Sequence, residues 1–125
     1  MTVVLDTNAL MMPVECDVRL FDELERLLGD VACVVPDAVI TELTELSTGS
    51  GLEARAASVG LDLADRCEVV EAAAGYADHA VVELAETAAV THVVTNDRAL
   101  RRRLLDRDVS VISLRGKNKL AIIQP

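Results

Sequence analysis

Short runs of β-branched and other apolar residues alternate with longer stretches of helical periodicity along this chain. The short runs predict strands over residues 3–5, 32–35, 67–70, 92–94 and 109–114. The longer stretches place apolar residues on one helical face and predict helices over residues 14–28, 38–46, 52–64, 78–88 and 98–105. The run at residues 120–123 is also apolar, but its pattern fits both strand pairing and simple packing.

Strands that alternate with helices are typical of right-handed βαβ units, which build a mostly parallel sheet. Strands that are apolar throughout indicate that helices cover both faces of that sheet. We therefore expect the α/β class with three layers, α/β/α, in a single domain of residues 1–125. Sheets of this kind bind ligands at the carboxyl ends of their strands, so functional side chains are expected there.

Composition narrows the class of protein further. Hydrophobic residues make up 51% of the chain, enough for one packed core. Cys16, Cys33 and Cys67 are isolated in the sequence, which favours three small core residues over a disulfide framework or a zinc site. No apolar run approaches the ~20 residues of a membrane span, and the first residues lack the features of a signal peptide. The expectation is a soluble cytoplasmic protein with no membrane partner.

The charge of the chain is unevenly distributed. The net charge is −9, yet residues 98–125 hold eight of the twelve basic side chains and only two of the 21 acidic ones. This distribution indicates one basic edge that could meet phosphate groups locally on an otherwise acidic protein. An ordinary solvated helix around Arg101, Arg102 and Arg103 explains the same charges equally well.

Four acidic residues occupy positions where ligands bind in this fold class. Asp6 and Asp97 each follow a predicted strand directly, so both should project from the same edge of the sheet. Glu42 lies on or beside the apolar stripe of one helix, and Asp78 begins another. A carboxylate placed toward a core is costly unless something compensates it, and a shared cation would do so. Singly, each acid also fits a helix cap, a turn or a solvated position, so the expectation depends on all four occurring together.

Four segments of the chain resemble the PIN-domain nucleases, namely VLDTNAL at 4–10, PDAVITEL at 36–43, DHAVVELA at 78–85 and VTNDRAL at 94–100. The order and spacing of these segments fit the pattern of that family, and the resemblance covers essentially the whole chain. It implies a mostly parallel five-stranded sheet in the order 3-2-1-4-5 and a metal-dependent endoribonuclease. It also implies that the catalytic and metal-binding residues are Asp6, Glu42, Asp78 and Asp97, with Asn8 and Thr95 as supporting polar residues.

The likeness differs between branches of that family. Residues 111–120 look more like the archaeal and eukaryotic PIN proteins associated with ribosomal-RNA processing, which would bring ribosome-assembly factors as partners. Toxin members of toxin–antitoxin pairs often carry a further Asp and an aromatic where this chain has Ala99 and Leu100. A toxin-type ribonuclease with an antitoxin partner, and a non-catalytic scaffold that binds RNA or protein, remain the alternatives. A homodimer is compatible with the family.

All the ligand atoms expected at this site are oxygens. Carboxylates without His or Cys favour Mg²⁺ or Mn²⁺ over zinc, so His79 and His92 are expected to be structural or surface residues. Without a cation, clustered carboxylates repel one another, and the pKa of some of them should lie above the ordinary value.

Contact with RNA is expected from basic residues of the C-terminal quarter and from one aromatic residue. Tyr76, in the loop before Asp78, is the one candidate platform for base stacking, because Phe21 lies on a core stripe. The basic residues expected to contact RNA are Arg98, Arg101, Arg102, Arg115, Lys117 and Lys119.

Overall fold

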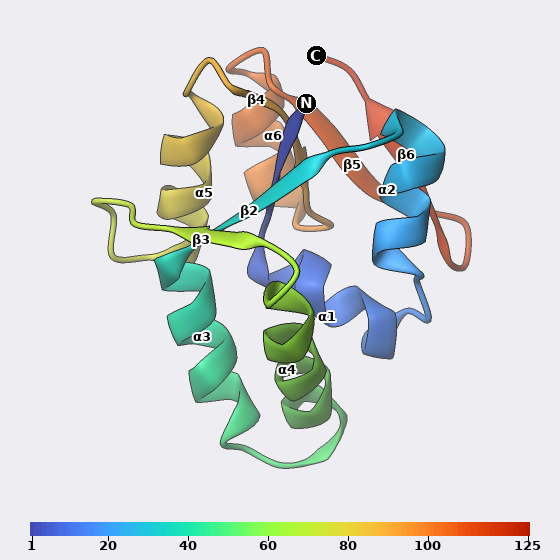
Figure 1. Cartoon of the computed structure of the whole chain (residues 1–125), viewed down its shortest axis with the longest axis vertical. Helices are drawn as coiled ribbons and strands as arrows, with labels where there is room; N and C mark the ends of the chain where they lie inside the picture. Colours follow the sequence, from blue (N-terminus) through green and yellow to red (C-terminus); the bar gives the residue numbers. More distant parts are fainter.

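A six-stranded sheet runs through the middle of the computed structural model, which describes residues 1–125 (Figure 1). Its spatial order is β3-β2-β1-β4-β5-β6, and the first five strands are parallel. The strands are β1 (Thr2–Leu5), β2 (Ala32–Pro36), β3 (Glu68–Val70), β4 (Val90–Val94), β5 (Ser110–Arg115) and β6 (Lys119–Ile123). The α/β class and the order of the first five strands are confirmed.

The predicted count of five strands is one too low. Residues Lys119–Ile123 pair with β5 in the antiparallel direction and form the outer strand β6. The turn between the two strands contains Gly116 at φ +72°, a left-handed conformation that glycine adopts without steric cost. The apolar run that the pattern left undecided is therefore part of the sheet.

Helices cover both faces of the sheet and also extend beyond it. α5 and α6 pack together on one face, whereas α1 and α2 pack on the other. The α3–α4 hairpin packs against α1 and projects below the carboxyl edge of the sheet in Figure 1. The helices are α1 (Thr7–Glu15), α2 (Leu20–Leu28), α3 (Asp37–Ser47), α4 (Gly51–Ala64), α5 (Ala77–Ala85) and α6 (Arg98–Leu105). None of them combines the length and apolar character that a bilayer crossing requires.

The predicted helix over residues 14–28 is wrong, because two helices meet in this region. α1 ends at Glu15, and the chain then turns through Asp17, whose φ is +53°. Val18 is buried but non-helical, so it extended the apparent apolar stripe across the break. The first helix in fact starts at Thr7, where the sequence pattern gave no helix.

Helix α4 lies close against α1 at Gly60. A Cβ atom at this position would lie 2.9 Å from the main-chain carbonyl oxygen of Leu10, which cannot move aside as a side chain can. Gly60 therefore allows the α3–α4 hairpin to dock on α1 and, through it, on the sheet.

Replacing Gly60 with Ala is expected to destabilise the protein by about 1–3 kcal/mol through overpacking. The better helix propensity of Ala, about 1 kcal/mol, offsets only part of this cost. Urea unfolding measures the difference, and Ser58→Ala, at an exposed position of the same helix, is the matched control. A Gly60→Ala protein as stable as Ser58→Ala would contradict the close contact.

Candidate active site

Asp6 stands at the junction of β1 and α1 and is the only one of the four predicted acids that is buried, with 6% of its surface exposed. Its Oδ1 accepts a hydrogen bond from the amide of Ala9 at 2.7 Å, so the carboxylate also caps α1. Burial raises the pKa of Asp6 to about 7, with smaller contributions from the charges of Asp97 and Glu42, while hydrogen bonds from Thr95 and Ala9 oppose the rise. The expected rise in pKa is confirmed here, but burial rather than repulsion is its main cause.

Asp97 repeats this arrangement at the end of the neighbouring strand. Its Oδ1 accepts a hydrogen bond from the amide of Leu100 at 2.8 Å and caps α6. Its own amide donates to Thr95 Oγ1 at 3.0 Å, which fixes the backbone just before the cap. The helix-cap and site interpretations of Asp6 and Asp97 are therefore compatible, since one oxygen makes the cap and the other remains.

Two asparagines connect the ends of three strands. Asn8 Oδ1 accepts from the amide of Asn96 at 2.9 Å, and Asn96 Oδ1 accepts from the amide of Leu114 at 2.9 Å. These bonds join the start of α1 to the end of β4 and then to β5. Asn96 was not among the predicted supporting residues, because its partner Leu114 is distant in sequence.

The structure brings the four predicted acids around one cavity of about 340 Å³. They come from four separate segments: the ends of β1 and β4, the middle of α3 and the start of α5. The residues lining the cavity are Asp6, Thr7, Asn8, Glu42, Ala77, Asp78, Asp97 and Leu100.

Glu42 and Asp78 meet solvent at the cavity and carry no burial cost of their own. Both side chains are exposed at the cavity, whereas Val39 and Leu43 form the buried face of α3. Glu42 lies beside that face, so it meets solvent rather than the core. The cost of burying a carboxylate therefore applies to Asp6 alone.

Asp78 has a basic partner that the sequence did not indicate. Its Oδ2 lies 3.4 Å from Arg103 Nη1, and this ion pair joins α5 to α6. Both side chains are substantially exposed, so the pair adds little stability. It does place a positive charge beside the acidic cavity, and Arg103 was missed because the pair spans two helices.

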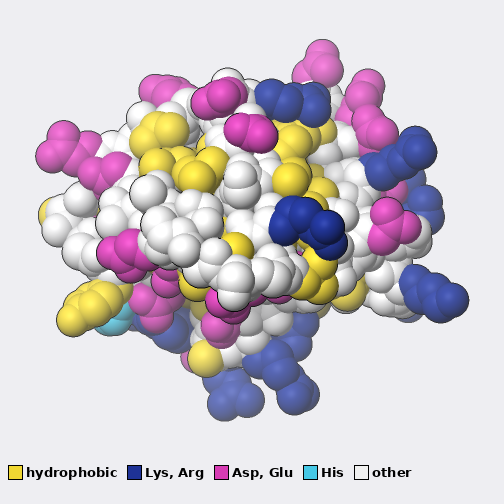
Figure 2. Space-filling model, turned by 90° about the horizontal axis from the view of Figure 1, so that it is seen from below, with side chains coloured by type: hydrophobic (Ala, Val, Ile, Leu, Met, Phe, Trp, Pro, Cys, Tyr) yellow, Lys and Arg dark blue, Asp and Glu magenta, His cyan; other side chains and the backbone are white.

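The six basic residues predicted to contact RNA do not line the cavity. Arg101 is half-buried and donates to the hydroxyl of Ser113 at 3.3 Å, and Lys119 lies 3.9 Å from Glu23. The remaining four, Arg98, Arg102, Arg115 and Lys117, are exposed. On the face seen in Figure 2, basic side chains lie at the right and lower margins, and others lie at the top and near the centre.

Tyr76 precedes α5 beside the cavity and is 75% exposed. Its ring centre lies 5.9 Å from that of His79, which is also exposed. An exposed ring next to the acidic cavity is available for stacking with a nucleobase, and a side chain this exposed does not anchor the loop by burial. Neither His79 nor His92 lines the cavity, as expected.

The donors around the cavity suit a hard divalent cation. Thr7 lines the cavity next to Asp6, and its buried Oγ1 has no hydrogen-bond partner in the protein. No three Asp, Glu, His or Cys side chains lie close enough to form a ready-made ion cage. Mg²⁺ fits such a site because it binds directly to one or two carboxylates and keeps several of its waters.

Known proteins that are similar to this chain in sequence or in structure include nucleases. Ribonuclease VapC4 of Methanocaldococcus jannaschii is 28% identical over 124 residues, covering 96% of this chain and 95% of that protein. The structure of the PIN domain endonuclease Utp24 matches with a TM-score of 0.82 at 23% identity, over 99% of this chain and 92% of that one.

A chain of the VapBC2 complex from Rickettsia felis, solved with a DNA fragment from its promoter, matches with a TM-score of 0.65 at 16% identity. That match covers 90% of this chain and 98% of the other. The family model described as "PIN like domain" matches residues 3–117, which include all four acids. The chain therefore belongs to the PIN-like domain family.

Proposed function

We propose that this protein is an endoribonuclease that hydrolyses RNA phosphodiester bonds with Mg²⁺ or Mn²⁺ as its cofactor. The observation that carries this proposal is the convergence of four carboxylates, from four separate segments, on one cavity. The likeness to a protein named as a ribonuclease supports RNA as the substrate. When bound, a divalent cation lowers the pKa of a coordinated water and offsets negative charge on the phosphate.

In this proposal the four carboxylates have two different roles in binding the cation. Asp6 and Asp97 are the direct ligands, because each is held rigidly at a strand end and keeps a second oxygen beyond the one that caps a helix. Glu42 and Asp78 are exposed at the cavity, so they bind the ion through water or position the attacking water. All four are thus proposed as both catalytic and metal-binding residues.

The polar residues near these acids would position them. The hydroxyl of Thr95 serves both direct ligands, since it hydrogen-bonds Asp6 and accepts the amide of Asp97. Asn8 ties the first turn of α1 to the end of β4 through Asn96. Such supporting bonds fix the orientation of ligating carboxylates. Their loss typically lowers metal affinity or activity by roughly 10- to 100-fold.

The substrate would extend from the cavity toward basic side chains and Tyr76. With one RNA phosphate bound at the acidic cavity, the neighbouring phosphates would be bound by the basic residues Arg98, Arg101, Arg102, Arg115, Lys117 and Lys119. Stacking on the exposed ring of Tyr76 would hold an unpaired base next to the cleaved bond. With only one such ring, sequence-specific recognition by this domain alone is weak, and RNA shape or a partner supplies specificity.

We place the biological role in ribosomal-RNA processing in the cytoplasm, with ribosome-assembly factors as partners and a homodimer as the proposed assembly. The tail at residues 111–120 and the absence of an acid and an aromatic at Ala99 and Leu100 favour this role. The alternative, a toxin-type ribonuclease with an antitoxin, is supported by the 28% identity to Ribonuclease VapC4. Mapping the RNAs crosslinked to the protein in cells separates the two.

The purified protein is expected to cut a generic unstructured RNA in Mg²⁺ or Mn²⁺ and to stop when EDTA is added. Glu42→Gln should lower the cleavage rate by at least about 10-fold, because the cavity loses one of its four charges. Glu45→Gln is the matched control, since Glu45 is exposed on the same helix and does not line the cavity. Gel-resolved cleavage kinetics measure both variants.

Absence of divalent-dependent cleavage over a range of RNAs would instead favour a non-catalytic scaffold. Equal rates for the two glutamine variants would remove Glu42 from the active site while leaving the other three acids to be tested.

A further inference from the structure

Two cysteines that are far apart in sequence are neighbours at the β2–β3 edge of the sheet. The register pairs Val34 with Glu68, so Cys33 and Cys67, one residue earlier on each side, lie next to each other. Adjacent strands are about 4.8 Å apart, within the range of about 4.4–6.8 Å over which a disulfide can join two Cα atoms. As predicted, both cysteines pack against the core, but they are only half-buried there, and their isolation in the sequence does not extend to the fold.

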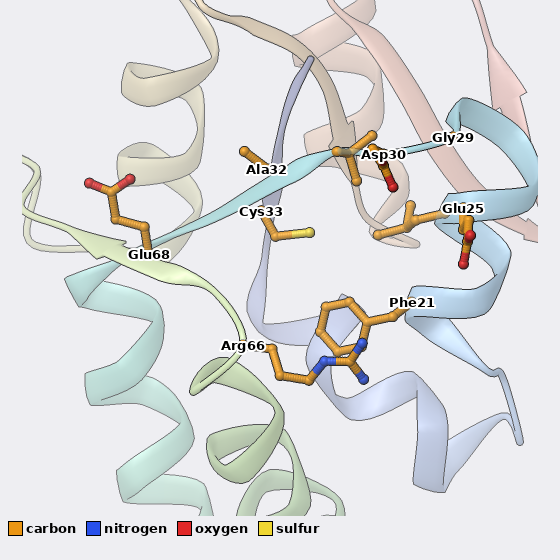
Figure 3. Close-up of a pocket in the computed structure, with 10 residues that line it drawn as sticks. Phe21, Glu25, Gly29, Asp30, Ala32, Cys33, Arg66 and Glu68 are labelled. Atoms are coloured by element: carbon orange, nitrogen blue, oxygen red, sulfur yellow. The ribbon is translucent and has the colours of Figure 1, made fainter.

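Cys33 is also open to small molecules. It lines a pocket of about 430 Å³ between α2 and the start of β2, outside the acidic cavity. In Figure 3 its sulfur points into this pocket, toward the side where Phe21 and Arg66 lie. The Arg66 guanidinium sits 4.0 Å from the centre of the Phe21 ring. Arg66 lines the same pocket as Cys33, and its positive charge acts on the thiol.

The two thiols differ in chemical character. A hydrogen bond from the thiol of Cys67, together with the charge of Arg66, lowers the pKa of Cys33. The same hydrogen bond and burial raise the pKa of Cys67. Cys33, and not Cys67, lines the open pocket together with Arg66, so Cys33 is the attacking sulfur and Cys67 the one that resolves.

We propose that Cys33 and Cys67 form a dithiol modification site that hydrogen peroxide converts into an intrachain disulfide. In the first step the Cys33 sulfur attacks the peroxide, the O–O bond breaks, and a sulfenic acid forms as water leaves. In the second step the Cys67 sulfur attacks the sulfenic sulfur, the S–O bond breaks, and a second water leaves as the S–S bond forms. Overall the two thiols lose two electrons and two hydrogens, and hydrogen peroxide is reduced to two waters.

The disulfide closes a loop that contains the whole α3–α4 hairpin. Cross-linking a loop of this length restricts the unfolded chain more than the folded one. The oxidised protein is therefore expected to melt about 5–10 °C above the reduced protein, and dithiothreitol should reverse the shift. This site is independent of the nuclease proposal, because neither cysteine lines the acidic cavity.

The test treats the full chain with a few equivalents of hydrogen peroxide and measures its intact mass and melting temperature. A loss of about 2 Da, the two hydrogens removed, and a proteolytic peptide linking Cys33 to Cys67 are the expected results. Cys16→Ser is the matched control and should behave as wild type, because the third cysteine lies elsewhere, at the end of α1.

Cys67→Ser should stop at a sulfenic acid on Cys33, which dimedone traps, and Cys33→Ser should give no intrachain link. If either variant fails to fold, the other still tests the pair together with the wild-type peptide map. Linkage of Cys16, disulfides only between chains, or no mass loss while the thiols over-oxidise would each overturn the proposal.

Discussion

Replacing Asp6 with Asn is expected to lower the rate of RNA cleavage by at least about 10²-fold while the fold stays intact. The amide oxygen of Asn can still accept the hydrogen bond from Ala9 that caps α1, so the helix start is preserved. What disappears is the negative charge at the most enclosed of the four acids, the one proposed to hold the cation directly. The variant thus separates the chemistry of this residue from its structural role.

Stability measurements complete the test of Asp6. Burial of its carboxylate, reflected in a pKa of about 7, is unfavourable without a cation, so metal-free Asp6→Asn should melt at or above the wild-type temperature. Mg²⁺ or Mn²⁺ should raise the melting temperature of the wild type and raise that of the variant less, because a ligand that binds only the folded state stabilises it. Thermal melts with and without each cation measure both effects.

A suitable control is Asp62→Asn, at an exposed position of α4 outside the cavity, which should leave cleavage and the effect of Mg²⁺ unchanged. If Asp6→Asn cleaves RNA at the wild-type rate, with contaminating nuclease excluded, Asp6 has no catalytic role. If it is inactive but also unfolded, its cap to Ala9 is essential to the fold, and Asp97→Asn becomes the informative variant.

The sequence predicted those parts of the molecule that are encoded locally. Alternation of apolar strands with amphipathic helices is a short-range signal, so the five parallel strands and most of the helices could be placed. The carboxyl-end rule for parallel sheets then put Asp6 and Asp97 together without any knowledge of contacts, and both do line one cavity. The rule needs only the identity of the residue that follows each strand.

Predictions failed where one residue plays two roles or where a stripe crosses a break. The cap role of Asp6 was treated as an alternative to its role in the site, whereas Asp6 caps α1, which starts at Thr7, and lines the cavity as well. Val14 and Val18 are both at least partly buried, so they continued an apolar stripe over the turn at Asp17 and merged two helices into one. Hydrophobic periodicity cannot register a backbone turn whose flanking residues both face the core.

Tertiary pairs gave no local signal at all. The pairs Asp78–Arg103, Asn96–Leu114 and Cys33–Cys67 each join residues from separate elements, and nothing in their immediate sequence marks the partner. They became visible only once crossover connections had brought the elements together. The first two pairs lie at the proposed active site, and the third forms the proposed cysteine site. The chemistry of both sites therefore depends on the fold rather than on any local motif.

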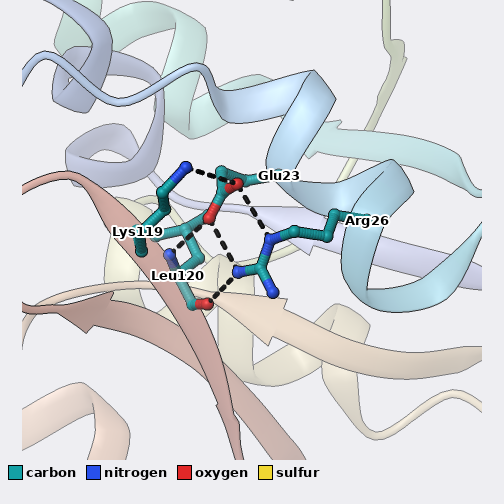
Figure 4. A network of polar contacts seen from close by, with 4 residues as sticks. All are labelled: Glu23, Arg26, Lys119 and Leu120. Carbon is teal, nitrogen blue, oxygen red and sulfur yellow. Dashed lines mark hydrogen bonds and ion pairs between the residues drawn. The ribbon is translucent and has the colours of Figure 1, made fainter.

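Glu23 secures the outer edge of the sheet from α2, as Figure 4 shows. Its Oε1 accepts the amide of Leu120 at 2.8 Å, and both carboxylate oxygens accept hydrogen bonds from Arg26. Arg26 in turn donates to the carbonyl oxygen of Leu120 at 2.8 Å. The two side chains therefore satisfy a main-chain donor and acceptor of edge strand β6 that would otherwise lack partners, much as another strand would.

Replacing Glu23 with Ala is expected to destabilise the protein by about 3 kcal/mol, because the amide of Leu120 loses its partner and Arg26 its carboxylate. Urea unfolding at pH 7 measures this loss, and Glu25→Ala, at an exposed position of the same helix, should change stability by less than about 0.5 kcal/mol. A Glu23→Ala protein no less stable than Glu25→Ala would mean that α2 is not held to β6 through this carboxylate.

The same contacts predict how the stability difference depends on pH. Hydrogen bonds from Arg26 and Leu120 lower the pKa of Glu23 from 4.5 to about 2 in the folded protein. Since the folded value lies below the unfolded one, the stabilisation is complete above about pH 4.5 and disappears as the pH falls toward 2. The exposure of Arg26 weakens the interaction, so the expected size is about 2–3 kcal/mol. The difference in unfolding free energy between wild type and Glu23→Ala should therefore decrease steadily between pH 5 and pH 3, roughly as the Glu23 carboxyl is protonated. A difference that stays constant over this range would show that the charge of Glu23 does not contribute to stability.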